Sequence, residues 1–100
     1  MEQSVFKYRI NELLNALPVK EYKKAMRIIP RQLGISDKTF SNYRNIKIND
    51  VQDIPHEKVA LLEKLLDVKP GELENFIIIV NPIRLINDDD MMPAKISIRY

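Results

Sequence analysis

Basic side chains gather in one part of the chain. Residues 18–47 hold eight Lys and Arg but only two acidic residues, Glu21 and Asp37. Such an excess of positive charge attracts phosphate by releasing counterions, whatever the base sequence of the nucleic acid. A solvated helix face has the same composition, so charge alone nominates this region without assigning a function. The eight residues are Lys20, Lys23, Lys24, Arg27, Arg31, Lys38, Arg44 and Lys47.

Side chains suited to catalysis or metal binding are scarce. The 100 residues include no Cys and a single His, His56, which excludes a disulfide, a thiolate zinc site and a cysteine nucleophile. The acidic run Asp88–Asp90 lacks the spacing and the Gly of a calcium loop. No glycine-rich phosphate loop and no nucleophile with its base is present. We therefore expect a protein that is not an enzyme and has no cofactor.

The length of the chain predicts one small domain with a single core. No apolar run approaches the ~20 residues that cross a bilayer. The first four residues, Met1-Glu2-Gln3-Ser4, lack the basic stretch and apolar run of a secretory signal. We therefore expect a cytoplasmic location and no membrane partner.

The positions of apolar residues predict a body of five helices over residues 1–76. Within each segment they recur every three or four positions, which places them on one helical face. Pro30 lies inside the second segment, where it predicts either a kink or a helix end near Ile29. The segments are about 3–16, Val19–Leu33, about 37–45, about 55–67, and a short helix that follows Pro70-Gly71 and ends near Phe76.

The residues Leu33-Gly34-Ile35-Ser36 predict a helix end, a tight turn and a new helix start. Gly34 is suited to the left-handed conformation that closes a helix, and Ser36 is suited to capping the next one. In the helix that follows, Phe40 and Tyr43 are expected to point inward. The polar residues between them are expected to face outward.

Residues 77–100 are predicted to form strands. The β-branched run Phe76–Val80 is too short for a helix of its own, and Lys95–Tyr100 alternates polar and apolar residues in the manner of a half-buried strand. Ile83–Ile86 is a further candidate strand. An apolar strand needs cover against aggregation. We expect pairing between two subunits to provide it, with a hairpin inside one chain as the alternative.

The chain resembles the Cro/repressor-like helix-turn-helix family over residues 31–76. The segment RQLGISDKTFSNY, which starts at Arg31, is similar to the family's turn and recognition helix, with Phe40 and Tyr43 at the apolar positions. The segment EKVALLEKLLDVKPGEL, which starts at Glu57, looks like the family's fourth helix and the start of its fifth. The resemblance implies a mainly α fold, a five-helix lambda-repressor-like DNA-binding body over 1–76 with a short β-forming tail over 77–100.

The resemblance also implies a sequence-specific DNA-binding regulator similar to phage-type repressors. Helix 37–45 would then lie in the major groove of double-stranded DNA, and the protein would bind as a homodimer through residues 76–100. Base contacts are expected from Lys38, Thr39, Ser41 and Asn42. Phosphate contacts, which set the register without reading sequence, are expected from Arg27, Arg31, Arg44 and Lys47.

A second interpretation belongs to another class of protein. Residues 51–100 hold six basic and nine acidic residues, and the tail is apolar. Both features suit a protein-interaction module, such as an antitoxin or an adaptor, on a helix-turn-helix scaffold with weak affinity for DNA.

Overall fold

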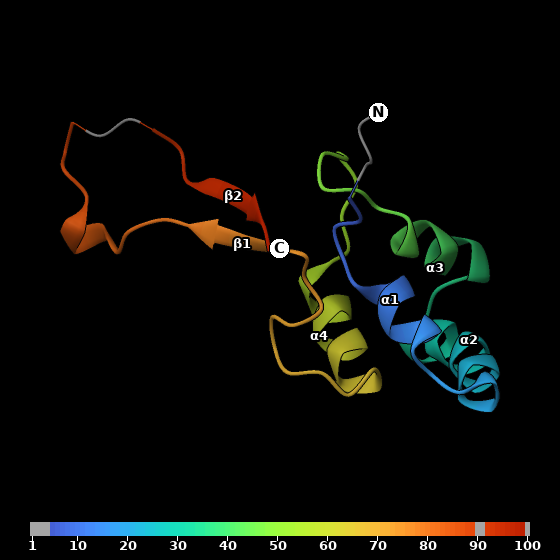
Figure 1. The fold of residues 1–100 in the computed structure, drawn as a ribbon. Coiled ribbons are helices and arrows are strands. Elements are labelled where there is room, and N and C mark those ends of the chain that lie inside the picture. The colour runs from blue at the N-terminus through green and yellow to red at the C-terminus, as the bar shows by residue number, and fades with distance from the viewer. Residues whose placement is uncertain (1–4, 90–91, 100) are drawn as a thin grey trace.

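The computed structural model describes residues 5–89 and 92–99, which form a small mixed α/β structure. The helices make one body, and a two-stranded antiparallel hairpin projects from it (Figure 1). The elements are α1 (Ile10–Asn15), α2 (Val19–Leu33), α3 (Asp37–Arg44), α4 (His56–Leu65), β1 (Phe76–Ile79), the 3-10 turn η1 (Ile83–Leu85) and β2 (Lys95–Ile98).

One hydrophobic core lies between the helices. Its innermost side chains come from α1, α3, α4 and the turn after α4, and less than 2% of each is exposed. Most of the buried residues lie in the segments whose apolar spacing predicted a helix. The five innermost residues are Phe40, Ile10, Leu14, Leu62 and Leu73.

The first helix is much shorter than the predicted 3–16. Residues 3 and 4 lie outside the described part of the chain, and residues 5–9 form no helix, with isolated β-bridges at Phe6 and Tyr8. Their backbone groups bond to distant segments: the Lys7 N–H donates to the Ile46 carbonyl (2.8 Å), and the Arg9 N–H to that of Leu73 (2.7 Å). The periodicity was misleading here because this pairing with distant segments replaces helical hydrogen bonds.

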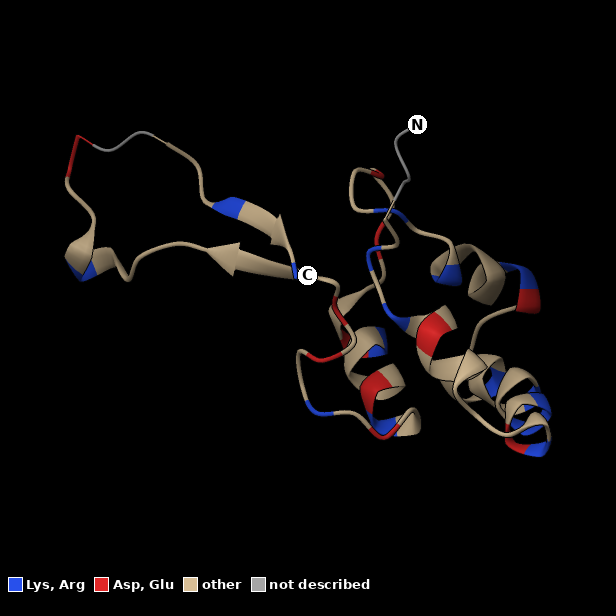
Figure 2. Cartoon of the chain, viewed as in Figure 1, with Lys and Arg blue, Asp and Glu red and all other residues tan. Residues whose placement is uncertain are grey.

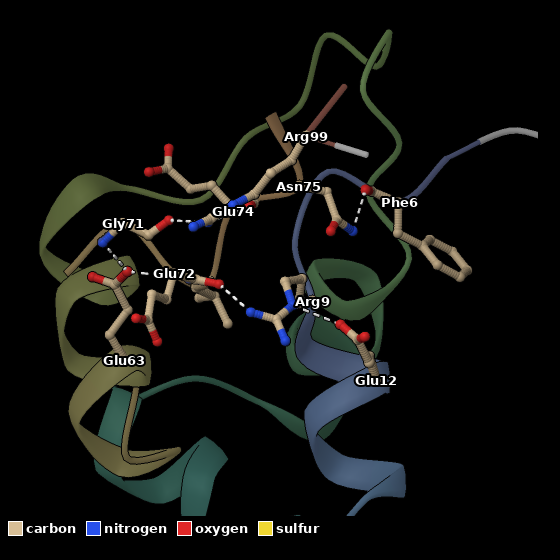
Figure 3. A network of polar contacts seen from close by, with 10 residues as sticks. Phe6, Arg9, Glu12, Glu63, Gly71, Glu72, Glu74, Asn75 and Arg99 are labelled. Atoms are coloured by element: carbon tan, nitrogen blue, oxygen red, sulfur yellow. Dashed lines mark hydrogen bonds and ion pairs between the residues drawn. The ribbon is translucent and has the colours of Figure 1, made fainter. Parts of the chain in front are cut away.

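The predicted five-helix body is wrong, because the segment 70–76 forms no helix. Gly71 has φ +88°, and the carboxylate of Glu63 accepts hydrogen bonds from the N–H groups of Gly71 (2.6 Å) and Leu73 (3.4 Å) (Figure 3). The Asn75 N–H donates to the carbonyl of Lys7 (2.9 Å). These donors are therefore committed to a buried side chain and to another segment, so the described residues hold four α-helices, not five.

Helix α2 continues through Pro30 to Leu33, so the alternative in which it ends near Ile29 is wrong. Pro30 removes one N–H donor close to the end of the helix. The carbonyl of Pro30 still accepts a hydrogen bond from the Ile35 N–H (3.0 Å), which holds the following turn against the end of the helix. A proline near the last turn is tolerated here because only one interior hydrogen bond is lost.

The tail folds back on itself. Strand β1 pairs with β2 of the same chain, so the structure shows the hairpin rather than strand pairing between subunits. Ile83–Ile86 is not a strand, because the N–H groups of Leu85 and Ile86 donate to carbonyls three residues earlier. The candidate strand Lys95–Tyr100 is confirmed over Lys95–Ile98, and Tyr100 lies outside the described residues.

Replacing Glu63 by Ala should lower the free energy of unfolding by about 1–3 kcal/mol, because two N–H groups lose an acceptor in a mostly buried site. Glu63→Gln keeps a side-chain oxygen and should recover most of the loss. Urea unfolding followed by circular dichroism measures both. Lys64→Ala, on the exposed face of the same helix, is the control and should change stability by less than about 0.5 kcal/mol. Equal effects of the Glu63→Ala and Lys64→Ala changes would contradict the role assigned to Glu63.

Candidate nucleic-acid interface

The helix-turn-helix geometry begins with the end of α2. Gly34 is left-handed at φ +68°, and its N–H donates to the carbonyl of Arg31 (3.1 Å). Ser36 has extended backbone angles, and its hydroxyl accepts a hydrogen bond from the Thr39 N–H (3.0 Å). The predicted helix stop and N-cap are both confirmed, and together they set the angle at which α3 leaves the turn.

The inner face of α3 is anchored by aromatic rings. Phe40 is 1% exposed in the core, and Tyr43 packs half-buried against it. Lys38, Ser41 and Asn42 lie on the outer face. The side chains of these three make no hydrogen bond to any described residue, so they are available to an external partner.

Thr39 differs from the other predicted base-contacting residues. Its hydroxyl oxygen accepts a hydrogen bond from the Ser36 hydroxyl (3.0 Å), and the residue is half-buried. Thr39 therefore completes the N-terminal cap of α3. Any contact with DNA would have to share this hydroxyl.

Arg44 holds α3 against the rest of the body. Its Nε donates to the side-chain oxygen of Asn11 (2.8 Å), and the Asn11 amide donates to the Arg44 carbonyl (3.1 Å). Its guanidinium also lies 3.7 Å from the sulfur of Met26 and 5.8 Å from the Phe40 ring centre. This predicted phosphate contact is thus also a link between α1, α2 and α3.

Arg27 and Arg31 lie on exposed turns of α2 beside the start of α3. With Met26, Asp37 and Phe40 they line a groove of about 360 Å³. Within the described residues neither arginine forms an ion pair, so their charge is not neutralised by Asp37. Lys and Arg recur along α2, whose one acidic residue is Glu21, whereas acidic and basic residues alternate along α4 and the turn after it (Figure 2).

Lys47 lies in the loop after α3. Its side chain is exposed, and its backbone N–H donates to the Asp50 carboxylate (2.9 Å). A β-bridge joins Lys47 to Phe6, so the N-terminal segment 5–9 fixes the position of this loop.

A polar cluster around Asp53, which the sequence did not predict, also holds the N-terminal segment 5–9 in place. Asp53 accepts hydrogen bonds from the Lys7 ammonium group (2.8 Å) and from the Tyr8 hydroxyl. Burial, together with this hydrogen bond, raises the pKa of Tyr8. Burial opposes the ionisation of Asp53, but the hydrogen bonds it accepts outweigh that effect and lower its pKa. Forty-five residues separate Tyr8 from Asp53, and no local spacing signals such a pair.

The described residues contain no group of three or more His, Cys, Asp or Glu side chains placed to hold a metal ion. No helix within 5–89 and 92–99 is both long enough and apolar enough to cross a membrane. Comparisons with protein-family models, with curated proteins and with solved structures gave no match.

Replacing Asp53 by Asn should lower stability at neutral pH. The pKa of Asp53 is lower in the folded state than in the unfolded chain, so the contribution of the carboxylate is present above the unfolded-state pKa and is lost as pH falls through the folded-state value. The difference between variant and wild type should therefore shrink below a pH of about 4. Thermal unfolding at neutral and acidic pH tests this, with Asp88→Asn as the control. A difference that does not depend on pH would exclude the ionised carboxylate as its source.

Proposed function

We propose that this protein is a sequence-specific DNA-binding regulator that places α3 in the major groove. The observation that carries the proposal is the outer face of α3, where Lys38, Ser41 and Asn42 are exposed while Phe40 holds the helix from behind. Lysine suits the acceptors of guanine, and an asparagine amide pairs with adenine. The proposed location is the cytoplasm, because a regulator similar to phage-type repressors binds DNA there.

The phosphate contacts are proposed to come from Arg27, Arg31 and Lys47, which flank α3 on the preceding helix and the following loop. All three are exposed. Phosphate contacts of this kind position a helix over the groove without reading bases. Arg44 belongs to the same set. Because Arg44 also bonds to Asn11, its main contribution to DNA binding is proposed to be structural: it fixes the angle between α3 and α1.

Two copies are proposed to act together on DNA. One recognition helix reads only a few base pairs, and two related by a two-fold axis read two half-sites. The proposed regulator is therefore a homodimer on an inverted repeat.

The protein-interaction module remains the second candidate, because one specific observation favours it. Strands β1 and β2 expose large apolar side chains, which is a feature of protein contacts. Duplex DNA binding decides between the two: a module with weak affinity for DNA would keep its partner contacts but bind duplexes weakly and without a preferred sequence.

Binding to duplex DNA of mixed sequence should weaken steeply as salt rises. Roughly six phosphate contacts predict a slope near −5 in a plot of log affinity against log salt. Arg31→Ala should weaken binding to all duplexes about equally and reduce the slope by about one. The charge-matched control is Lys69→Ala, in the turn after α4, which should leave the slope unchanged. No binding at low salt, or binding indifferent to salt, would exclude the proposed function.

Lys38→Ala and Asn42→Ala should relax sequence preference. After selection of a preferred duplex, each should cost on the order of 1–3 kcal/mol on that duplex and much less on random DNA. Competition titrations with both duplexes measure the difference. If neither variant changes the preference, α3 does not read the bases.

A further inference from the structure

Helix α3 is held in the body mostly by side chains. Helix α2 packs closely against α1 and α4, whereas the backbone of α3 packs less closely against any other helix. Phe40 is the one residue of α3 in the buried core. A single buried ring fixes the depth of a helix of eight residues, but it leaves the direction of that helix to the contacts at its two ends.

The C-terminal end of α3 is fixed by Asn11, which lies in α1. The side-chain oxygen of Asn11 accepts a hydrogen bond from the Arg44 Nε (2.8 Å), and its amide donates to the Arg44 carbonyl (3.1 Å). Arg44 is the last residue of α3, and both residues are half-buried. Two bonds in opposite directions between the same residues fix the orientation of this helix end as well as its distance from α1.

The N-terminal end of α3 is fixed through the residue that ends α2. The ammonium group of Lys58, on α4, donates a hydrogen bond to the carbonyl of Leu33 (2.9 Å). A carbonyl at the end of a helix has no partner within that helix, and the helix dipole favours a cation there. Leu33 lies three residues before Ser36, the N-cap of α3. The half-buried Lys58 therefore ties the turn from which α3 starts to α4.

We propose that Asn11 and Lys58 are positioning residues for DNA recognition. From outside α3 and the turn before it, they set the direction in which the outer face of α3 meets DNA. Side chains that read a ligand must be held to within about 0.5 Å by the groups that support them. The inference rests on the proposed function and deepens it, because it names two residues outside the expected DNA contacts on which sequence preference depends.

Asn11→Leu and Lys58→Met test the two contacts, because the new side chains have similar sizes and cannot make these hydrogen bonds. Competition titrations measure the ratio of affinities for the preferred and the random duplex. We expect each variant to lower this ratio at least about fivefold, because misdirected base contacts lose their geometry. The slope of log affinity against log salt should stay unchanged, because neither substitution removes a phosphate contact.

Three further variants separate positioning from a general loss of stability. Lys58→Arg keeps a donor that can reach the Leu33 carbonyl, so it should restore most of the affinity ratio. Glu63→Ala disturbs the turn after α4 and should lower stability without changing the ratio. Asn11→Ser has a side chain one atom shorter, and it replaces Asn11→Leu if that variant does not fold. Circular dichroism shows that each variant is folded at the temperature of the titrations.

An unchanged ratio in a variant would overturn the role of the residue it replaces, and an equal fall in Glu63→Ala would overturn both roles. A slope reduced by about one in Lys58→Met would make Lys58 a phosphate contact instead.

Amide hydrogen exchange without DNA gives a readout that does not depend on the DNA-binding proposal. Helix α3 should exchange faster in Asn11→Leu and Lys58→Met than in Glu63→Ala, because its ends are released locally. Equal exchange of α3 in the three variants would overturn the assignment of Asn11 and Lys58. A wild-type chain without a preferred duplex would instead overturn the proposed function, so the two failures can be recognised separately.

Discussion

The backbone of residues 5–9 is the constraint on which the rest of the structure depends. On one side it bonds to the loop after α3, through Lys7 to Ile46 and through Val5 to Ile48. On the other side Lys7 and Arg9 bond to the turn after α4. This short segment thus joins two parts of the chain that lie far apart in sequence, and buried backbone groups need such partners.

This segment also brings the proposed interface and the hairpin into one structure. Its contact with the loop at Ile46 lies directly after α3, the helix proposed to read DNA. Its contact with Asn75 lies directly before β1, and the Arg99 N–H returns to the Asn75 carbonyl (2.8 Å). The Lys7 ammonium group lies 5.4 Å from the ring centre of Phe76, and Lys7 also holds Asp53. The position of the hairpin relative to α3 therefore depends on a few hydrogen bonds around residues 5–9.

The surface around α3 and the hairpin favour contacts by different physical forces. Around α2 and α3 the cations lack ion-pair partners within the described residues, so in the proposed complex the phosphate groups of DNA would supply the opposite charge. The hairpin exposes large apolar side chains, so a contact there would be driven by burial of apolar area, which depends little on salt.

Local signals in the sequence determined the turn between α2 and α3, the inward position of Phe40 and the strands at the end of the chain. The conformations of Gly34 and Ser36 could be predicted from their residue types. A left-handed φ and an N-cap depend on the residue itself and on its neighbours in sequence. Tertiary structure decided three features: the non-helical segment 5–9, the absence of a helix over 70–76 and the pairing of β1 with β2. The first segment bonds to Ile46 and Leu73, and β1 bonds to the returning strand, all far along the chain. In the turn after α4 the donors meet the side chain of Glu63, one helix earlier, and the distant carbonyl of Lys7. Apolar periodicity indicates which side chains are buried in the core. It does not indicate which acceptor outside the local segment a backbone N–H will bond to.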